Sequence, residues 1–300
     1  LAAIGARSLD EIIGRADLLV QVNRGSKHLD DLDLNPLLIT VDGSDRIVYD
    51  RSRPRNAVMD TLDAEIIRDG ARFFEDGEKM QLSYAVRNTH RTIGTRTSSL
   101  IVQRFGMRND LQPDHLTVKL AGSAGQSLGA FAAPGLKIEV SGDANDYVGK
   151  GLSGGTIVVK PPMGSPLVAA ENTIIGNTVL YGATAGYLFA AGRAGERFAV
   201  RNSGATVVIE GCGSNGCEYM TGGVAVILGP IGANFGAGMT GGMAYLYDPE
   251  GAAAALMNME TLLTCQVTVP EWERELKDLI ERHAKETLSL KAQQILAKWD

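Results

Sequence analysis

Short apolar runs that follow glycine-rich turns recur through the middle of the chain. The turns at 149–155, 217–223 and 236–242 each combine glycine with Ser or Thr, and each leads into four mostly apolar residues. We index each repeat on its last small residue before the apolar run. The index residues are Gly135, Gly155, Gly186, Ala205, Gly223 and Gly242, and their successive numbers differ by 20, 31, 19, 18 and 19. Steps this regular indicate a repeat architecture.

The length of the repeat restricts the fold. About 19 residues are too few for two helices and their turns, but they suit short strands joined by tight turns. Strands at matching places in successive repeats would stack in parallel, about 4.8 Å apart. We therefore predict a mainly β fold, a parallel β-helix. The one long step contains the proline-rich stretch at 161–166, so we expect a surface loop inserted into that repeat.

Glycine is concentrated where the repeats are. Between residues 121 and 247 lie 27 of the 36 glycines of the chain. Corners between strands require some residues with positive φ, a conformation that glycine adopts at little cost. We assign this turn-forming role to Gly135, Gly149, Gly151, Gly154, Gly155, Gly186, Gly222, Gly223, Gly236, Gly238, Gly241 and Gly242.

Helix signals precede the repeats. Ser8 and Glu11 have the spacing of a capping box, and apolar residues at helical spacing follow as far as Val20. A second helix is expected from a cap at 60–61 to Gly77. These signals predict helical segments on the N-terminal side of the β region.

Further elements complete the pattern on both sides of the repeats. Apolar and polar residues alternate at 80–86 and 116–120, which predicts two half-buried strands, and a short helix is expected from about Thr97 to Gly106. Near the end of the chain, Pro270 opens one helix and Ser289 can cap another.

These patterns predict three parts. Residues 1–35 read as the tail of a preceding domain with a linker, and 36–265 as a β-helix domain whose repeats are strongest at 121–247. Residues 266–300 read as C-terminal helices. Flanking helices would cover the open ends of the stacked strands, which could otherwise pair with another chain.

Composition narrows the functional classes. The net charge of −6 gives no general attraction to nucleic acid or to an anionic membrane. Three cysteines do not suggest a disulfide scaffold, so we expect a reducing, cytoplasmic setting. No apolar run is long enough to span a bilayer. Because the chain begins at Leu1 and enters a helix signal at once, we expect a piece of a longer protein.

Three glycine motifs match the sequence pattern of a nucleotide-binding site. The stretches 149–154, 211–216 and 236–241 all match the G-x-G-x-x-G pattern. That pattern binds a dinucleotide only when it opens a helix whose N-terminus holds the pyrophosphate. Here each match leads to a short apolar run and recurs with the repeat. We interpret these glycines as corners, and keep a dinucleotide-binding enzyme as a weaker alternative.

One polar stretch stands out as a candidate contact site. Arg87, Asn88, His90 and Arg91 lie within five residues after a predicted strand. Side chains of this kind must meet solvent or hydrogen-bond a partner, and we expect an inter-domain network rather than catalysis. The three cysteines and four scattered histidines show no metal-site spacing. We assign no catalytic, metal-binding or cofactor-binding residue to this chain.

Several long stretches carry a family resemblance. The segments 82–94, 122–131 and 142–155, the tail at 279–300 and the start at 8–19 together resemble the C-terminal region of the glutamate synthase large subunit. The resemblance implies a right-handed β-helix, and it makes residues 1–35 the end of an FMN-binding synthase domain. It covers nearly the whole chain.

The family resemblance also implies a function. Glutamate synthases form two glutamates from glutamine, 2-oxoglutarate and a reductant, and so assimilate ammonia. They use an N-terminal cysteine amidotransferase, FMN, an iron–sulfur cluster and electrons from NADPH or ferredoxin. None of these parts maps onto this sequence, so the resemblance implies a non-catalytic scaffold. Its partners would be the amidotransferase and FMN-binding domains of the same subunit, and the family adds a small NADPH-oxidising subunit as a further candidate.

A second resemblance is a glycine-repeat subunit of another complex, such as the third subunit of formylmethanofuran dehydrogenase. The N-terminal helix signal and the polar stretch at 87–94 argue against it.

Overall fold

The computed structural model describes residues 1–40, 59–108 and 110–299. The chain forms two compact units, Leu1–Met59 and Asp60–Asp300, and each is described by itself. The boundary expected after residue 35 stays a prediction.

Short 3₁₀ turns make up the described part of the first unit. They span Ala2–Ile4, Leu9–Glu11, Ala16–Leu18 and Asn35–Leu37. The helix expected from Ser8 to Val20 is therefore wrong. The Ser8 hydroxyl donates to the Glu11 carboxylate over 3.4 Å and caps no backbone N–H. None of the four turns buries a residue, and a short helix that packs against nothing is marginal in water.

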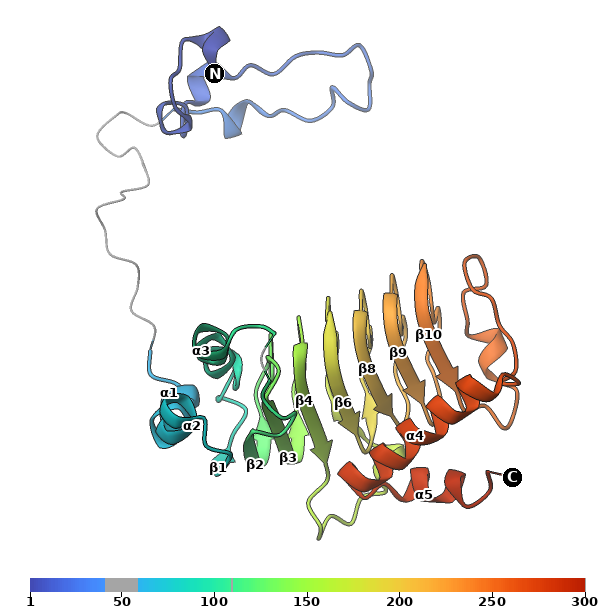
Figure 1. The fold of residues 1–300 in the computed structure, drawn as a ribbon. Coiled ribbons are helices and arrows are strands. Elements are labelled where there is room, and N and C mark those ends of the chain that lie inside the picture. The colour runs from blue at the N-terminus through green and yellow to red at the C-terminus, as the bar shows by residue number, and fades with distance from the viewer. Residues whose placement is uncertain (41–58, 109, 300) are drawn as a thin grey trace. The chain divides into compact units, whose positions relative to one another are not determined.

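The second unit begins with two helices, the edge strand of the sheet and a third helix (Figure 1). The helix expected to end at Gly77 is two helices, α1 (Leu62–Asp69) and α2 (Ala71–Asp76), separated at Gly70. Glycine is a poor helix former, which explains the break. Next come β1 (Met80–Val86) and α3 (Thr95–Phe105), and α3 ends at Gly106 as expected.

A parallel sheet of ten strands forms the body of this unit (Figure 1). The remaining strands are β2 (Leu116–Ala124), β3 (Leu136–Ala144), β4 (Ser153–Lys160), β5 (Thr173–Ile175), β6 (Ala185–Ala190), β7 (Arg193–Ala194), β8 (Ser203–Ile209), β9 (Thr221–Ile227) and β10 (Gly241–Leu246). The order along the sheet is β1-β2-β3-β4-β6-β8-β9-β10, and β5 joins β3 to β7. The sheet is open, with β1 and β10 at its edges. The expectation of stacked parallel strands with flanking helices is confirmed.

Strand register reproduces the repeat read from the sequence. One inward-facing column of paired residues illustrates this: Val118, Ile138, Ile157, Leu188, Val207, Ala225 and Ala244. Their successive numbers differ by 20, 19, 31, 19, 18 and 19. The index residues Gly135 and Gly155 differ by 20, whereas the paired residues Lys137 and Thr156 differ by 19, so Gly155 lies one place later in its repeat than Gly135 does.

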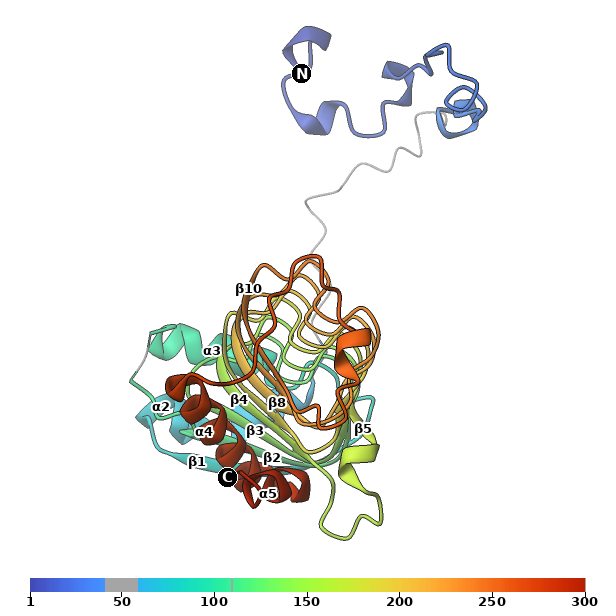
Figure 2. The same cartoon turned by 90° about the vertical axis from the view of Figure 1, so that its right-hand side faces the viewer.

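The long step carries the expected insertion. Between β4 and β5 the chain contains a loop and a 3₁₀ turn, Ala169–Glu171. Met163 in this loop is almost fully exposed. In Figure 2, which looks along the stack, the other strands of the sheet lie behind one another.

Each repeat from β2 to β9 also contains a turn in which every second residue has positive φ. We call these three residues the alternating triplet. The triplets are Ser127/Gly129/Phe131, Tyr147/Gly149/Gly151, Thr178/Leu180/Gly182, Arg197/Ala199/Arg201, Asn215/Cys217/Tyr219 and Asn234/Gly236/Gly238. Their N–H groups donate along the stack in both directions. The outer residues donate to the next repeat, as Phe131 does to the Lys150 carbonyl over 2.8 Å, and the middle residues donate to the preceding one, as Gly149 does to the Leu128 carbonyl over 2.9 Å. The middle residue of each triplet is buried.

Most glycines expected at corners do have positive φ. Gly155, Gly222 and Gly241 are the exceptions among the twelve. There the limit is space: a Cβ on Gly222 would lie 2.4 Å from the carbonyl oxygen of Ser203, and one on Gly241 would lie 2.4 Å from that of Thr221. Neighbouring repeats approach too closely for a side chain at these points. The turn-forming role of the twelve glycines stays a prediction.

Two C-terminal helices pack on the outer face of the sheet. Helix α4 (Pro270–Thr287) contacts β4, β6 and β8, and α5 (Leu290–Leu296) packs beside it (Figures 1 and 2). They share a second apolar cluster with the sheet, in which Phe189, Val208 and Ile280 are buried. Residues between β10 and α4, including the 3₁₀ turn Ala253–Ala255, continue the stack beyond the last strand through the bridge between Phe235 and Met257.

We expect two glycine substitutions to distinguish the cost of a steric clash between repeats from the cost of a positive φ. Gly222→Ala should lower the free energy of unfolding by about 3 kcal/mol, because two backbones would have to separate. Gly182→Ala should cost only about 1 kcal/mol, since φ is +65° but nothing lies within 4 Å of the new Cβ. Urea unfolding of the two variants measures both. Equal losses would contradict this assignment of the crowded position.

Candidate functional site

The polar turn at 87–91 follows β1 directly, at the edge of the sheet. Its backbone is held locally: His90 N–H donates to the Arg87 carbonyl over 2.8 Å, and Arg87 N–H donates to His90 Nδ1 over 3.3 Å. The His90 carbonyl accepts from Gly125 N–H over 3.0 Å, which ties the turn to the next repeat. A Cβ on Gly125 would lie 2.4 Å from the Asn88 carbonyl oxygen, so the approach is close.

The side chains of this turn are open. Arg87, Asn88 and Arg91 are exposed, and His90 is half-buried. Among the described residues, none gives a hydrogen bond or ion pair to the side chains of Arg87, Asn88 or Arg91. The turn thus presents two guanidinium groups and an amide on a fixed backbone. Such groups can bind carboxylates or carbonyls of a partner surface. Their predicted inter-domain role stays a prediction.

A buried carboxylate fixes the segment that follows the turn. Asp63 of α1 accepts from the N–H groups of Gly94 and Arg96, each over 2.7 Å, and of Thr97 over 3.1 Å, at the start of α3. Burial raises the pKa of Asp63, and the same N–H groups act against that shift. The positive end of the helix dipole at the N-terminus of α3 also stabilises this carboxylate.

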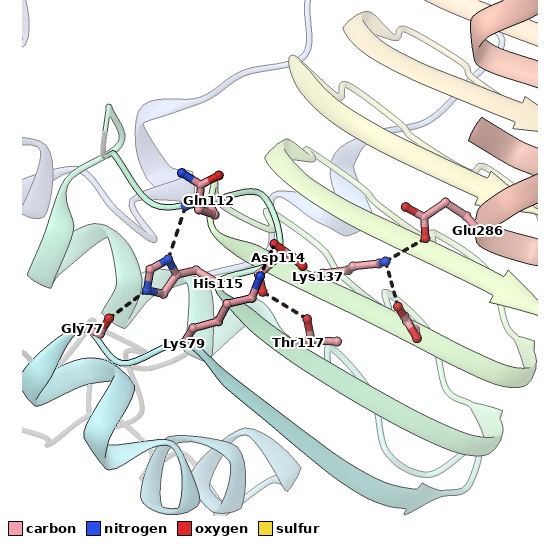
Figure 3. A network of polar contacts seen from close by, with 9 residues as sticks. Gly77, Lys79, Gln112, Asp114, His115, Thr117, Lys137 and Glu286 are labelled. Atoms are coloured by element: carbon pink, nitrogen blue, oxygen red, sulfur yellow. Dashed lines mark hydrogen bonds and ion pairs between the residues drawn. The ribbon is translucent and has the colours of Figure 1, made fainter. Parts of the chain in front are cut away.

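A network of polar contacts connects α2, β1 and the start of β2 (Figure 3). Gln112 N–H donates to His115 Nδ1 over 3.4 Å, so the ring carries its proton on Nε2 and donates to the Gly77 carbonyl over 2.8 Å. Lys79 Nζ lies 2.9 Å from Asp114 Oδ1. Hydrogen bonds from Lys79 lower the pKa of Asp114. The arrangement joins the end of α2 to the start of β2, and its Lys79–Asp114 ion pair is exposed.

A lysine joins the outer face of β3 to α4 (Figure 3). Lys137 Nζ lies 2.7 Å from Glu286 Oε2 and 2.8 Å from Glu139 Oε1. Burial alone would lower the pKa of Lys137, but the hydrogen bonds and charges of the two carboxylates outweigh it and raise the pKa above 10.5. The ammonium group therefore stays charged and holds the helix against the sheet.

A second polar group lies fully buried under α4 and α5. Glu210, directly after β8, accepts a short hydrogen bond from the Ser289 hydroxyl, which also caps α5 by accepting from Ala292 N–H over 3.0 Å. His283 Nε2 lies 3.6 Å from Glu210 Oε1. Glu210, His283 and Ser289 are each at most 3% exposed. A substrate could not reach them, so this serine, histidine and carboxylate serve to dock the helices.

The described residues do not fit a resident metal or nucleotide. No group of three or more His, Cys, Asp or Glu among them could hold a metal ion. Burial raises the pKa of the Cys212 thiol to about 12 and that of Cys217 well above its ordinary value, so neither is poised as a thiolate. The three G-x-G-x-x-G matches lead into β4, β9 and β10 rather than into helices, so none offers a helix N-terminus to a phosphate.

Sequence reasoning missed two sets of residues. The alternating triplets include Phe131, Leu180 and Tyr219, residue types that seldom adopt positive φ. The buried Glu210 had a weak signal, a single carboxylate at the end of the apolar run 205–209. Of the predicted polar residues, the structure joins Arg87 and His90: the Arg87 N–H donates to the His90 ring, and the His90 N–H donates to the Arg87 carbonyl.

Comparisons with known proteins agree with one another. The model of the GXGXG motif family matches residues 63–300. The chain is 63% identical over 299 residues to the glutamate synthase [NADPH] large chain of Azospirillum brasilense, a match that covers all of this chain and 20% of that protein. It is 43% identical to the glutamate synthase [NADPH] large chain of Bacillus subtilis and 44% identical to the ferredoxin-dependent glutamate synthase of Pyropia yezoensis. These two matches again cover all of this chain, and 20% and 19% of those proteins.

The chain thus spans about a fifth of the length of the curated relatives it matches. Among the described residues, the structure contains no helix with the length and apolar character that crossing a bilayer requires.

We expect the contribution of Lys137 to stability to depend on alkaline pH. Its pKa is raised in the folded state, so this contribution is complete below pH 10.5 and is lost as the pH rises through the folded pKa. Lys137→Met should cost about 1 kcal/mol near neutral pH, since the site is partly solvated, and less at about pH 11. Urea unfolding at both pH values measures the difference.

Lys79→Met is the matched control, because its ion pair with Asp114 is exposed and should contribute about 0.5 kcal/mol or less. A Lys137→Met effect no larger than that of the control would refute the docking role.

We expect Ser289→Ala to lower the free energy of unfolding by about 2 kcal/mol. The substitution removes an N-cap and leaves the buried Glu210 carboxylate without its donor. Ser99→Ala, at an exposed position of α3, is the control and should change stability by about 0.5 kcal/mol at most. Equal midpoints for the two variants in urea would contradict a docking role for the buried group.

Proposed function

The chain belongs to the GXGXG motif family, and from that premise we propose that it is a non-catalytic scaffold within a glutamate synthase large chain. The observation that carries the proposal is the 63% identity along the whole chain to a protein of which this chain covers only 20%. A region so similar from end to end is expected to occupy the same place in a larger enzyme.

The parent enzyme would convert L-glutamine, 2-oxoglutarate and a reductant into two molecules of L-glutamate. Its partners for this region would be the amidotransferase and FMN-binding domains of the same chain, and residues 1–35 would be the end of the FMN-binding domain. A small NADPH-oxidising subunit is a further candidate partner. The relatives' names include both NADPH and ferredoxin, so the proposal does not specify the electron donor.

The chemistry of the parent would lie outside this region. FMN and an iron–sulfur cluster are the cofactors proposed for the whole enzyme, yet the residues described here do not fit either one. Two of the three cysteines are buried with raised pKa values, and the glycine motifs lead into strands. The polar turn with Arg87, Asn88, His90 and Arg91 would instead contact another domain.

We further propose that the parallel sheet is one wall of a right-handed β-helix. The near-constant offset between paired strands, about 19 residues, and the stacked alternating triplets support a coil that returns to the same place in each repeat. An experimental structure with the opposite hand or with a flat sheet would reject this. A coil of this kind is stiff because each repeat packs on its neighbours, which suits a spacer between two active domains.

The relatives' names do not favour the alternative of a formylmethanofuran dehydrogenase-like subunit. The three cysteines are unpaired, and we propose a reducing compartment, the cytoplasm, for the parent.

We expect the purified 300-residue chain to be colourless and to bind no FMN. It should neither hydrolyse glutamine nor consume 2-oxoglutarate, whereas the full-length large chain, as the control, should be yellow and should hydrolyse glutamine. Absorbance near the flavin bands and a glutamate assay provide the measurements. Stoichiometric FMN in the isolated chain would overturn the scaffold assignment.

A further inference from the structure

Two exposed aromatic residues occupy a backbone conformation that such residues avoid. Phe131 and Tyr219 are third members of their alternating triplets, with φ of 58° and 54°. They are 54% and 51% exposed. A bulky residue with positive φ is strained relative to glycine, and about half of each side chain stays in solvent. The third position itself accepts glycine, as at Gly151, Gly182 and Gly238.

The next repeat makes room for each ring. A Cβ on Gly151 would lie 2.4 Å from Cε1 of Phe131, and a Cβ on Gly238 would lie 2.5 Å from Cδ1 of Tyr219. Each ring therefore lies against the bare backbone of a glycine one repeat further along. The contact is made by the Cδ1–Cε1 side of each ring, and about half of each side chain stays exposed. These glycines hold an aromatic side chain in place at the surface rather than in the core.

Cations and further aromatic residues lie along the same corner. Lys150 Nζ is 5.7 Å from the centre of the Tyr147 ring, and Arg201 Cζ is 5.9 Å from the centre of the Tyr219 ring. Tyr147 and Tyr181 are each 37% exposed. We call Phe131, Tyr147, Lys150, Tyr181, Arg201 and Tyr219 the aromatic ridge. Backbone hydrogen bonds between successive triplets order its members along the stack; for example, Gly151 N–H donates to the Tyr181 carbonyl over 2.9 Å.

Other exposed tyrosines of the repeats have partners within the chain. The Tyr187 ring lies 4.0 Å from Cζ of Arg282, and the Tyr247 ring lies 5.0 Å from Nζ of Lys291, both on the C-terminal helices. Those rings help to dock α4 and α5. The ridge receives no such cover from either helix in the contacts of the described residues.

We propose that the aromatic ridge is the surface on which this region docks another domain of the same parent chain, through a patch of carboxylates set among apolar side chains. This inference rests on the proposed scaffold function and adds which face is used. Exposed rings that already pack against the backbone on one side have less freedom to lose on binding, and Tyr and Arg are enriched among the residues that dominate interface energies.

The chemistry of the partner follows from the two cations. Lys150 and Arg201 each approach a ring, and no acidic side chain pairs with them among the described residues. The neighbouring Glu218 is 2.9 Å from Arg197 and is balanced by it. The ridge thus carries two cations without an ion-pair partner among the described residues, although the chain has a net charge of −6, and carboxylates on a partner are their electrostatic complement. Four-fifths of each matched relative lies outside this region, which provides the other domain.

The test uses the full-length large chain with p-benzoylphenylalanine in place of Phe131, of Tyr181 or of Tyr219. After irradiation, mass spectrometry should find links from each position to peptides that precede this region and contain Asp or Glu. The same probe in place of Lys119, on the exposed outer face of β2, should give no such links. Arg201→Glu should lower the yield from Phe131 about tenfold, whereas Lys119→Glu should leave it unchanged within about twofold.

A double variant separates the loss of docking from a loss of folding. Phe131→Gly with Tyr219→Gly removes both rings and relaxes the backbone, so the isolated 300-residue chain should unfold at the same or higher urea concentration. In the full-length chain the same pair should lower the cross-link yield from Tyr181 about tenfold. A stable variant with an unchanged yield would overturn the proposal.

The remaining outcomes are also decisive. Links only within residues 1–300, only to a second copy of the chain, only from position 119, or from no position would each overturn the ridge as the docking face. If the full-length chain forms glutamate but shows one of these results, the ridge assignment fails and the scaffold function stands. If the full-length chain has no such activity, the proposed function itself fails.

Discussion

Backbone hydrogen bonding along the stack is the constraint on which this fold depends. Each turn must direct its N–H groups toward carbonyls of the repeats on either side, because buried backbone groups without partners are costly. The alternating triplets meet this requirement by placing every second residue in the left-handed region, as at Tyr147, Gly149 and Gly151. The middle residue then faces the core and the outer two face solvent. Core composition, glycine spacing and surface layout all follow from that alternation.

Much of this could be read from the sequence, because the repeat has a clear period. The strands at 80–86 and 116–120, the near-constant offset between paired strands and the cap at Ser289 were all visible as patterns. The alternation of positive φ within the triplets could not be recognised in the sequence, because only some triplet positions are glycine. Crowding at Gly222 was hidden as well, since it depends on a carbonyl from another repeat. The failed helix after Ser8 shows that a capping pattern needs a core to pack against.

Polar residues in this unit mainly attach one element to another. Asp63 fixes the start of α3, Lys137 joins β3 to α4, and Glu210 receives the cap of α5. Each interaction joins a helix to a different part of the sequence, which resists sliding of helices on the sheet. Removing one partner of a buried polar pair costs more than the pair contributes, because the other is left without hydrogen bonds. A rigid body with fixed surfaces is what a spacer between two domains requires.

Backbone strain at two exposed aromatic residues is the observation behind the proposed docking face. At the third triplet position, glycine satisfies the backbone at no conformational cost, and it does so at Gly182 with open space beside it. Phe131 and Tyr219 accept that cost while leaving about half of each side chain in water. The rest of each ring packs against a glycine of the next repeat, Gly151 or Gly238. The exposed half of each ring is the part that we propose a partner covers, and the glycines beside the rings mark where that contact would be made.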